Sequence, residues 1–210
     1  MRDAVIVPIA YLAPVSYYCR LLAYDDVRIE QWEHYIKQTY RNRCVIASES
    51  GPLSLSIPVE KVLPGTLVKE VRVSDHGNWR HMHWQALSTA YDRTPYFEFY
   101  ADDFRPFYEK KYHFLFDYTE ALRELICHLL DISPSVSLTQ SYMSQPEAED
   151  CRMLYTPKAK TSDAHFSPCP YYQVFSERCG FLPNLSVVDL LFNMGPESVF
   201  VLRKSFRQDS

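Results

Sequence analysis

The fourteen residues from 30 to 43 bring together acids, amides, aromatic rings and three cations, directly after a segment expected to form a parallel strand. In open α/β sheets, ligands bind beyond the carboxyl ends of the strands. Lys37, Arg41 and Arg43 could there hold a phosphate or a carboxylate, with arginine offering two parallel donors. The same run could instead be a solvated connection that pairs Glu33 with Lys37 one helical turn away. Composition alone leaves both interpretations open.

His81 and His83 stand two residues apart in a segment, residues 79–91, that is expected to be helical. On a helix their imidazoles lie about 200° apart, so they cannot share one ion, and no metal site is predicted. His83 shares a helix stripe with Trp79 and Leu87 and should face inward. It is either a hydrogen-bonded core histidine, which is the commoner situation, or a general base.

The polar segment from 140 to 170 is too long for an ordinary connection and has no clear helix or strand pattern. It carries Asp150, Arg152 and Lys158. A mobile basic segment that closes over an anionic ligand would have this composition, and so would any exposed loop. Arg152 and Lys158 are therefore candidate ligand contacts.

A helix near residues 187–193 has clear start and stop signals. Ser186 is the expected N-cap, with Asp189 as its capping-box partner, and Gly195 and Pro196 end the helix. Asp189 is thus predicted to be structural. No Ser-His-Asp order, nucleophile elbow or zinc-protease motif occurs.

The pattern of elements predicts one α/β domain over residues 1–210, with short and partly parallel strands. A strand at 5–9, a helix near 13–23 and a strand at 27–30 form a β-α-β start, which favours parallel pairing. Two extended segments, 44–46 and 53–59, flank a turn and predict a β-hairpin. The other expected elements are helices near 79–91, 112–130 and 187–193, and strands at 67–73, 136–139 and 199–202.

Composition excludes several classes of protein. A net charge of −4 argues against general binding to nucleic acid or to an anionic membrane. The five glycines stand too far apart to form a dinucleotide-binding loop or a P-loop, so no cofactor can be named. No apolar run predicts a membrane span or an export signal, and the six scattered cysteines suggest free thiols. We therefore expect a cytoplasmic protein.

Several strings in the sequence resemble the bacterial WbqC-like protein family. They are the opening A-Y-L-A-P-V-S-Y-Y at 10–18, the block Y-I-K-Q-T-Y-R-N-R-C at 35–44, W-R-H-M-H-W at 79–84, and the closing segments around 172–175 and 184–196. The resemblance covers nearly the whole chain. It departs at the start, where many members carry Gln-Pro after the first strand and this sequence has Pro8-Ile9-Ala10.

The resemblance implies a role near bacterial surface-polysaccharide biosynthesis, because genes of that pathway often accompany members of this family. It also favours a functional role for the matched block at 35–44, which is polar and basic where a core match would be apolar. The residues so implicated are Tyr35, Lys37, Arg41, Asn42 and Arg43.

Two hypotheses follow. In the first, the protein is a group-transfer enzyme, a possible transferase, that acts on an activated anionic donor such as a nucleotide-linked sugar or an acyl donor. Lys37, Arg41 and Arg43 would hold phosphate, Arg152 and Lys158 would close from the loop, and His83 or Glu30 would be the general base. In the second, it is a non-catalytic binding or scaffold protein of the same pathway, with some of its sixteen tyrosines and twelve phenylalanines as interface anchors. A pocket with converging cations and His83 would favour the enzyme.

Overall fold

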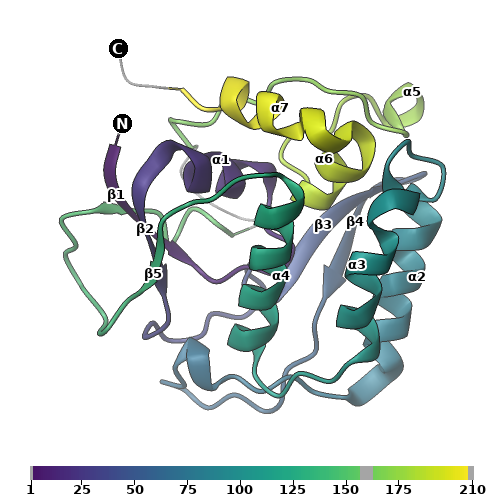
Figure 1. Cartoon of the computed structure of the whole chain (residues 1–210). Helices are drawn as coiled ribbons and strands as arrows, with labels where there is room; N and C mark the ends of the chain where they lie inside the picture. The colour runs from purple at the N-terminus through teal and green to yellow at the C-terminus, as the bar shows by residue number, and fades with distance from the viewer. Residues whose placement is uncertain (1, 157–162, 208–210) are drawn as a thin grey trace.

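A parallel pair of strands begins the fold (Figure 1), which we describe from a computed structural model covering residues 2–156 and 163–207. Strands β1 (Arg2–Pro8) and β2 (Tyr24–Glu30) pair in register from Arg2 opposite Tyr24 to Pro8 opposite Glu30, and helix α1 (Val15–Ala23) connects them. The apolar run of β1 is fully buried, as a strand between covered faces should be. The predicted β-α-β start is confirmed.

Two short strands extend this pair into a four-stranded sheet in the order β5-β2-β1-β6. Strand β5 (Val136–Leu138) runs parallel to β2, and β6 (Glu149–Asp150) runs parallel to β1. All four strands therefore point the same way. Their carboxyl ends meet along one edge, where ligands of parallel sheets bind.

A separate hairpin pairs β3 (Arg43–Ser48) with β4 (Gly51–Ser56) in antiparallel register. This is the predicted hairpin, with slightly shifted limits. The left-handed φ of 101° at Gly51 allows the tight turn between the two strands.

The predicted helices are all present. They are α1, α2 (Trp79–Tyr91), α4 (Leu115–Leu129) and α6 (Val187–Met194). Helix α3 (Phe97–Glu109) was not expected; it packs beside α2 and carries Pro106 in its last turn. The short helix α5 (Ser176–Cys179) and the terminal helix α7 (Ser198–Ser205) complete the set in the described part of the chain.

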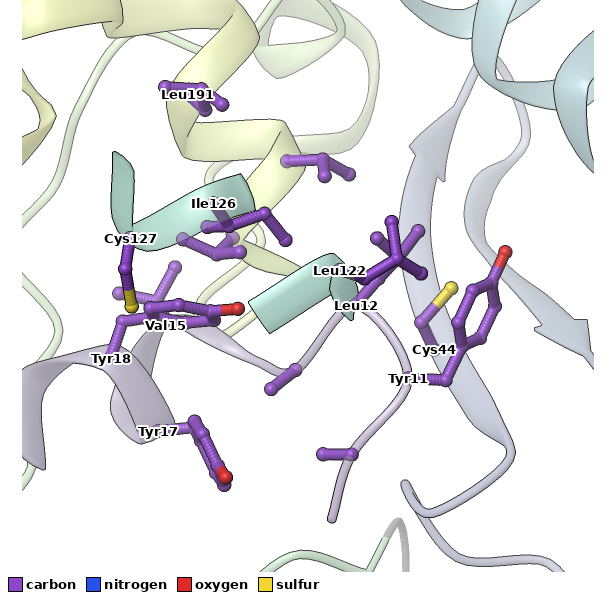
Figure 2. Close-up of a cluster of buried hydrophobic side chains, with 14 of the residues drawn as sticks. Tyr11, Leu12, Val15, Tyr17, Tyr18, Cys44, Leu122, Ile126, Cys127 and Leu191 are labelled. Atoms are coloured by element: carbon purple, nitrogen blue, oxygen red, sulfur yellow. The ribbon is translucent and has the colours of Figure 1, made fainter. Parts of the chain in front are cut away.

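The core joins the start of the chain to its end. Figure 2 shows Leu12 beside Leu122 of α4 and Tyr11 beside Cys44 of β3, with Val15 and with Leu191 of α6 in the same cluster. The cysteines are free thiols, and four of the six are buried. Burying these side chains in one cluster links helices from the two ends of the sequence.

Two predicted strands are wrong. Residues 67–73 contain a single 3₁₀ turn (Val68–Glu70) and isolated bridges, because no strand of the described part of the chain runs alongside them. Residues 199–202 lie inside α7, where Val201 and Leu202 face the core and Phe200 faces solvent. A four-residue apolar run does not distinguish a strand from a helix.

Asp189 has a structural role, but not the predicted one. The Ser186 side chain does cap α6, accepting from the Val188 backbone N–H. The Asp189 carboxylate instead accepts hydrogen bonds from the hydroxyls of Tyr91 and Tyr171 and from the Gln173 amide.

Candidate functional site

A cavity of about 330 Å³ opens at the carboxyl edge of the parallel sheet. Its walls come from the segments that follow β2, β5 and β6, which is where a parallel sheet is expected to bind ligands. The lining residues are Trp32, Glu33, His34, Ile36, Tyr142, Asp150, Arg152 and Met153.

Arg152 holds the parts of this cavity together. Its Nη1 donates to Glu30 at 3.1 Å, and its Nε and Nη2 donate to the two carboxylate oxygens of Asp150 at 2.9 and 2.6 Å. Nη2 also donates to the Met143 carbonyl at 2.8 Å, and the guanidinium lies 4.6 Å from the centre of the Tyr142 ring. One side chain thus fixes β2, β6 and the intervening loop.

Asp150 is the most accessible carboxylate of this group, with a side chain 39% exposed. Burial raises the pKa of Asp150, but the Arg152 donors outweigh that effect, and the pKa lies below its usual value. Asp150 is therefore ionised at neutral pH.

Glu30 lies behind the cavity and is fully buried. One of its carboxylate oxygens accepts from the Trp32 backbone N–H at 2.7 Å and from the Thr139 hydroxyl at 3.0 Å, and the other accepts from Arg152. Because these bonds engage both oxygens, the geometry favours a positioning role over that of a general base.

Arg41 is also committed to protein partners. Its Nε and Nη2 donate to the two carboxylate oxygens of Glu33 at 2.7 and 2.5 Å, and the side chain is fully buried. Burial raises the pKa of Glu33, while the hydrogen bonds from Arg41 oppose the rise. Arg41 fixes the Glu33 wall of the cavity and does not line it.

The cations of the 35–44 block do not converge. Lys37 is exposed and is not among the lining residues, although it follows Ile36, which is, and Arg43 donates to the Ser56 hydroxyl on the hairpin at 3.1 Å. Lys158 lies outside the described residues. Of the predicted cations, Arg152 lines the cavity, Arg41 lies behind it and Lys37 follows a lining residue.

Tyr35 and Asn42 donate hydrogen bonds to backbone carbonyls of neighbouring segments. The Tyr35 backbone N–H donates to the Thr66 carbonyl, and burial raises the pKa of its phenol to about 12. Asn42 donates from its side chain to the Ile57 carbonyl, and its buried Oδ1 has no partner among the described residues.

His83 lies in the core on α2, as its helix stripe predicted. Its Nδ1 is 2.9 Å from the Tyr11 hydroxyl, which in turn contacts the Tyr108 hydroxyl at 3.0 Å. Burial lowers the pKa of His83 to about 4. It is not among the residues that line the cavity, so the geometry matches the core-histidine interpretation.

A model of the WbqC-like protein family matches residues 10–168, a range that includes every residue lining the cavity. The chain belongs to the WbqC-like protein family. It is also similar to the uncharacterized protein Rv1507c of Mycobacterium tuberculosis (strain ATCC 25618 / H37Rv), with 26% identity over 229 residues that cover 97% of this chain and 98% of that protein. No solved structure matches the chain.

Of the eight residues that line this WbqC-like cavity, only Arg152 was predicted as a site residue; the other seven are Trp32, Glu33, His34, Ile36, Tyr142, Asp150 and Met153. Trp32 and His34 follow the end of β2 within four residues, so the strand-end rule could have found them. Trp32 is held by its indole N–H, which donates to the Thr139 carbonyl at 2.9 Å, and the Lys69 ammonium lies 3.0 Å from the ring centre. Tyr142 and Met153 follow β5 and β6 and could not be placed without the sheet order.

A larger cavity of about 630 Å³ lies between α4 and β5 of this WbqC-like fold. Its buried cation, Arg123, pairs with Glu120 at 2.9 Å on the same helix. In the described ranges, no group of three or more His, Cys, Asp or Glu side chains could hold a metal ion. Across residues 2–156 and 163–207, no helix combines the length and apolar character needed to cross a bilayer.

Proposed function

We propose that this protein is a group-transfer enzyme of bacterial surface-polysaccharide biosynthesis and that the cavity beside Arg152 binds a sugar-sized group. One observation carries the proposal: two aromatic rings, two carboxylates and a histidine line one cavity at the carboxyl edge of the sheet. Its volume of about 330 Å³ lies at the low end of the range for ligand pockets, roughly 300–1,000 Å³, which suits a single ring. Membership of the WbqC-like family supports the choice of pathway.

The anionic part of an activated donor would lie outside the cavity. Arg41 and Arg152 are already engaged by Glu33, Glu30 and Asp150, so they have little capacity left for a phosphate. Lys37 is exposed and follows Ile36, which lines the cavity, so we assign the phosphate contact to its ammonium. Lys158 and Arg43 stay in the proposal as weaker candidates.

His34 is the best candidate for the base. It is exposed, lines the cavity and is of the residue type that most often serves as a general base. An acceptor hydroxyl or amine would lose its proton to the imidazole as it attacks the activated carbon of the donor. The leaving group of the donor would depart with the bonding electrons.

The alternative, a binding protein of the same pathway, is favoured by a different observation. Both predicted bases, Glu30 and His83, are engaged by other side chains and do not line the cavity. A His34→Gln variant separates the two functions. An enzyme would lose turnover and keep its affinity, whereas a binding protein would have no turnover to lose.

The binding site can be tested with two tyrosines of equal exposure. Tyr142 lines the cavity and is 54% exposed, whereas Tyr172 is 55% exposed and is not among the lining residues. We expect Tyr142→Ala to weaken binding of UDP-glucose, UDP-N-acetylglucosamine or acetyl-coenzyme A about fivefold in calorimetric titration, because a stacked ring contributes about 1 kcal/mol. Tyr172→Ala should leave the affinity unchanged. Equal effects of the two variants, or no binding to wild type, would refute the assignment.

A further inference from the structure

The walls of the cavity carry more negative than positive charge. Two carboxylates, Glu33 and Asp150, and one guanidinium, Arg152, line it, which leaves one uncompensated negative charge. Behind the walls, Glu30 pairs with Arg152 and Arg41 pairs with Glu33, so these two buried residues add no net charge to the count. Lys69 lies on the Trp32 ring but is not among the lining residues.

The guanidinium donors that face the cavity are nearly all in use. Arg152 donates from Nε, Nη1 and Nη2 to Asp150, Glu30 and the Met143 carbonyl. Binding a phosphate there would require breaking these charge-assisted bonds, which are among the stronger hydrogen bonds in proteins. The cavity is therefore poorly suited to an anion.

The cavity is well suited to a cation that also carries hydroxyls. The Asp150 carboxylate is partly exposed and can accept further hydrogen bonds. The Trp32 and Tyr142 rings attract positive charge through their faces, and both already hold a cation: the Lys69 ammonium at 3.0 Å and the Arg152 guanidinium at 4.6 Å from the ring centres.

We propose that the cavity selects a hydroxylated ring, the size of one sugar, that bears an amine. The ammonium contacts Asp150, and the ring lies against Trp32 and Tyr142. This inference rests on the proposed function in one respect: both place a ligand in this cavity. The sequence led us to expect an anionic ligand, whereas this inference gives the group inside the cavity a positive charge.

The test compares rings that differ by one group. Wild type is titrated calorimetrically at pH 7 with D-glucose and with its 2-amino, 3-amino and 4-amino analogues. We expect at least one amino analogue to bind about tenfold more tightly than glucose. Asp150→Asn should remove that preference, so that the amino analogues bind no more tightly than glucose, because the amide side chain lacks the negative charge that attracts the ammonium.

Asp26→Asn is the matched control, since Asp26 pairs with Arg28 at 2.7 Å and its side chain is 37% exposed, away from the cavity. A second pair, Tyr142→Leu and Tyr172→Leu, tests the aromatic wall if Asp150→Asn melts at a lower temperature. Tyr142→Leu should reduce the amine preference and Tyr172→Leu should not.

The outcomes distinguish this inference from the proposed function. If glucose binds as tightly as every amino analogue, the inference is overturned while the cavity remains the binding site. Displacement of glucose by inorganic pyrophosphate would also overturn it, because an anion would then occupy the cavity. If none of the sugars binds and the nucleotide sugars bind equally to wild type and Tyr142→Ala, both proposals fail.

Discussion

His83 makes the stability of the protein sensitive to mild acid. It is 5% exposed, its Nδ1 is 2.9 Å from the Tyr11 hydroxyl, and burial lowers its pKa to about 4. Between its ordinary pKa of about 6.5 and pH 4, the unfolded chain binds a proton at this position and the folded chain does not. Stability linked to His83 is therefore present above about pH 6.5 and is lost as the pH falls towards 4.

His83→Gln should remove this part of the acid sensitivity. From pH 7 to pH 4, we expect the wild-type free energy of unfolding to fall by on the order of 2–3 kcal/mol more than that of the variant. Urea denaturation at several pH values measures the difference. His81→Gln is the control, because His81 is exposed on the same helix. Parallel pH profiles for wild type and His83→Gln would contradict the prediction.

The charges near the cavity could be listed from the sequence but not paired. Glu33 stands eight residues before Arg41, which is too far for a partner within one helical turn, and the intervening segment is irregular. Arg152 reaches Glu30 across 122 residues. A basic cluster predicts an anion site only if its cations lack partners, and pairing depends on the folded chain.

At the level of the elements, Gly195 controls how α6 meets α3. It follows α6 with a φ of 54°, and a Cβ at this position would lie 2.5 Å from carbons of the Tyr96 ring. Gly65 has a φ of 85°, but a Cβ there would meet no atom within 4 Å. The positive φ would strain the backbone of an alanine at either position, but only at Gly195 would the added methyl group also collide with a neighbouring side chain.

We expect Gly195→Ala to lower the free energy of unfolding by about 1–3 kcal/mol more than Gly65→Ala, which isolates the cost of overpacking from that of the left-handed backbone. Urea denaturation of both variants measures the difference. Tyr96→Ala should reduce the cost of Gly195→Ala in a double-mutant cycle. If the two glycine substitutions lowered the free energy of unfolding equally, the Tyr96 ring would have to move aside without measurable cost, which would contradict the prediction.

Helix α4 was predictable from its long periodic pattern, whereas the thirteen-residue helix α3 and several short elements were not predicted. The α4 stripe of buried residues, Leu115, Leu122 and Ile126, repeats at helical spacing within a helix of fifteen residues. The run at 199–202 is only four residues long, and its neighbours decide that it is helical. Residues 67–73 alternate as a strand would, yet no strand within the described ranges lies beside them. Strand β6 has two residues, and its pairing with β1 is invisible in the local sequence.

Asp189 links distant parts of the whole molecule. It is fully buried and accepts hydrogen bonds from Tyr91 at 2.9 Å, Tyr171 at 2.7 Å and Gln173 at 2.9 Å. These partners join the end of α2 and the segment before α5 to α6. Loss of this acceptor should therefore weaken the molecule globally.

Asp189→Asn should destabilise the protein by about 1–3 kcal/mol, because the new amide presents donors to a site that offers donors. Native-state hydrogen exchange should show reduced protection in α2 and α6 together. Asp92→Asn, at an exposed neighbour of Tyr91, should change neither helix. Loss of protection confined to α6 would mean that the link is local.

The candidate site was only partly predictable at this scale. The sequence indicated the region after β2 and the residue Arg152, since polar residues follow a strand-like run and basic residues occur in the long loop. The cavity itself needs β5 and β6 to be placed on opposite edges of the β1–β2 pair. That order follows from long-range pairing, which local sequence patterns do not encode.

The residues around the cavity form two groups that tolerate change to different degrees. Glu30, Arg41 and Arg152 are buried. Arg152 donates to Glu30, and Arg41 donates to the Arg152 carbonyl, so replacing one of the three leaves a buried partner without its hydrogen bond. The accessible group is His34, Ile36, Tyr142 and Met153. Substitutions in the accessible group should therefore alter ligand preference at a smaller cost in stability than substitutions in the buried group.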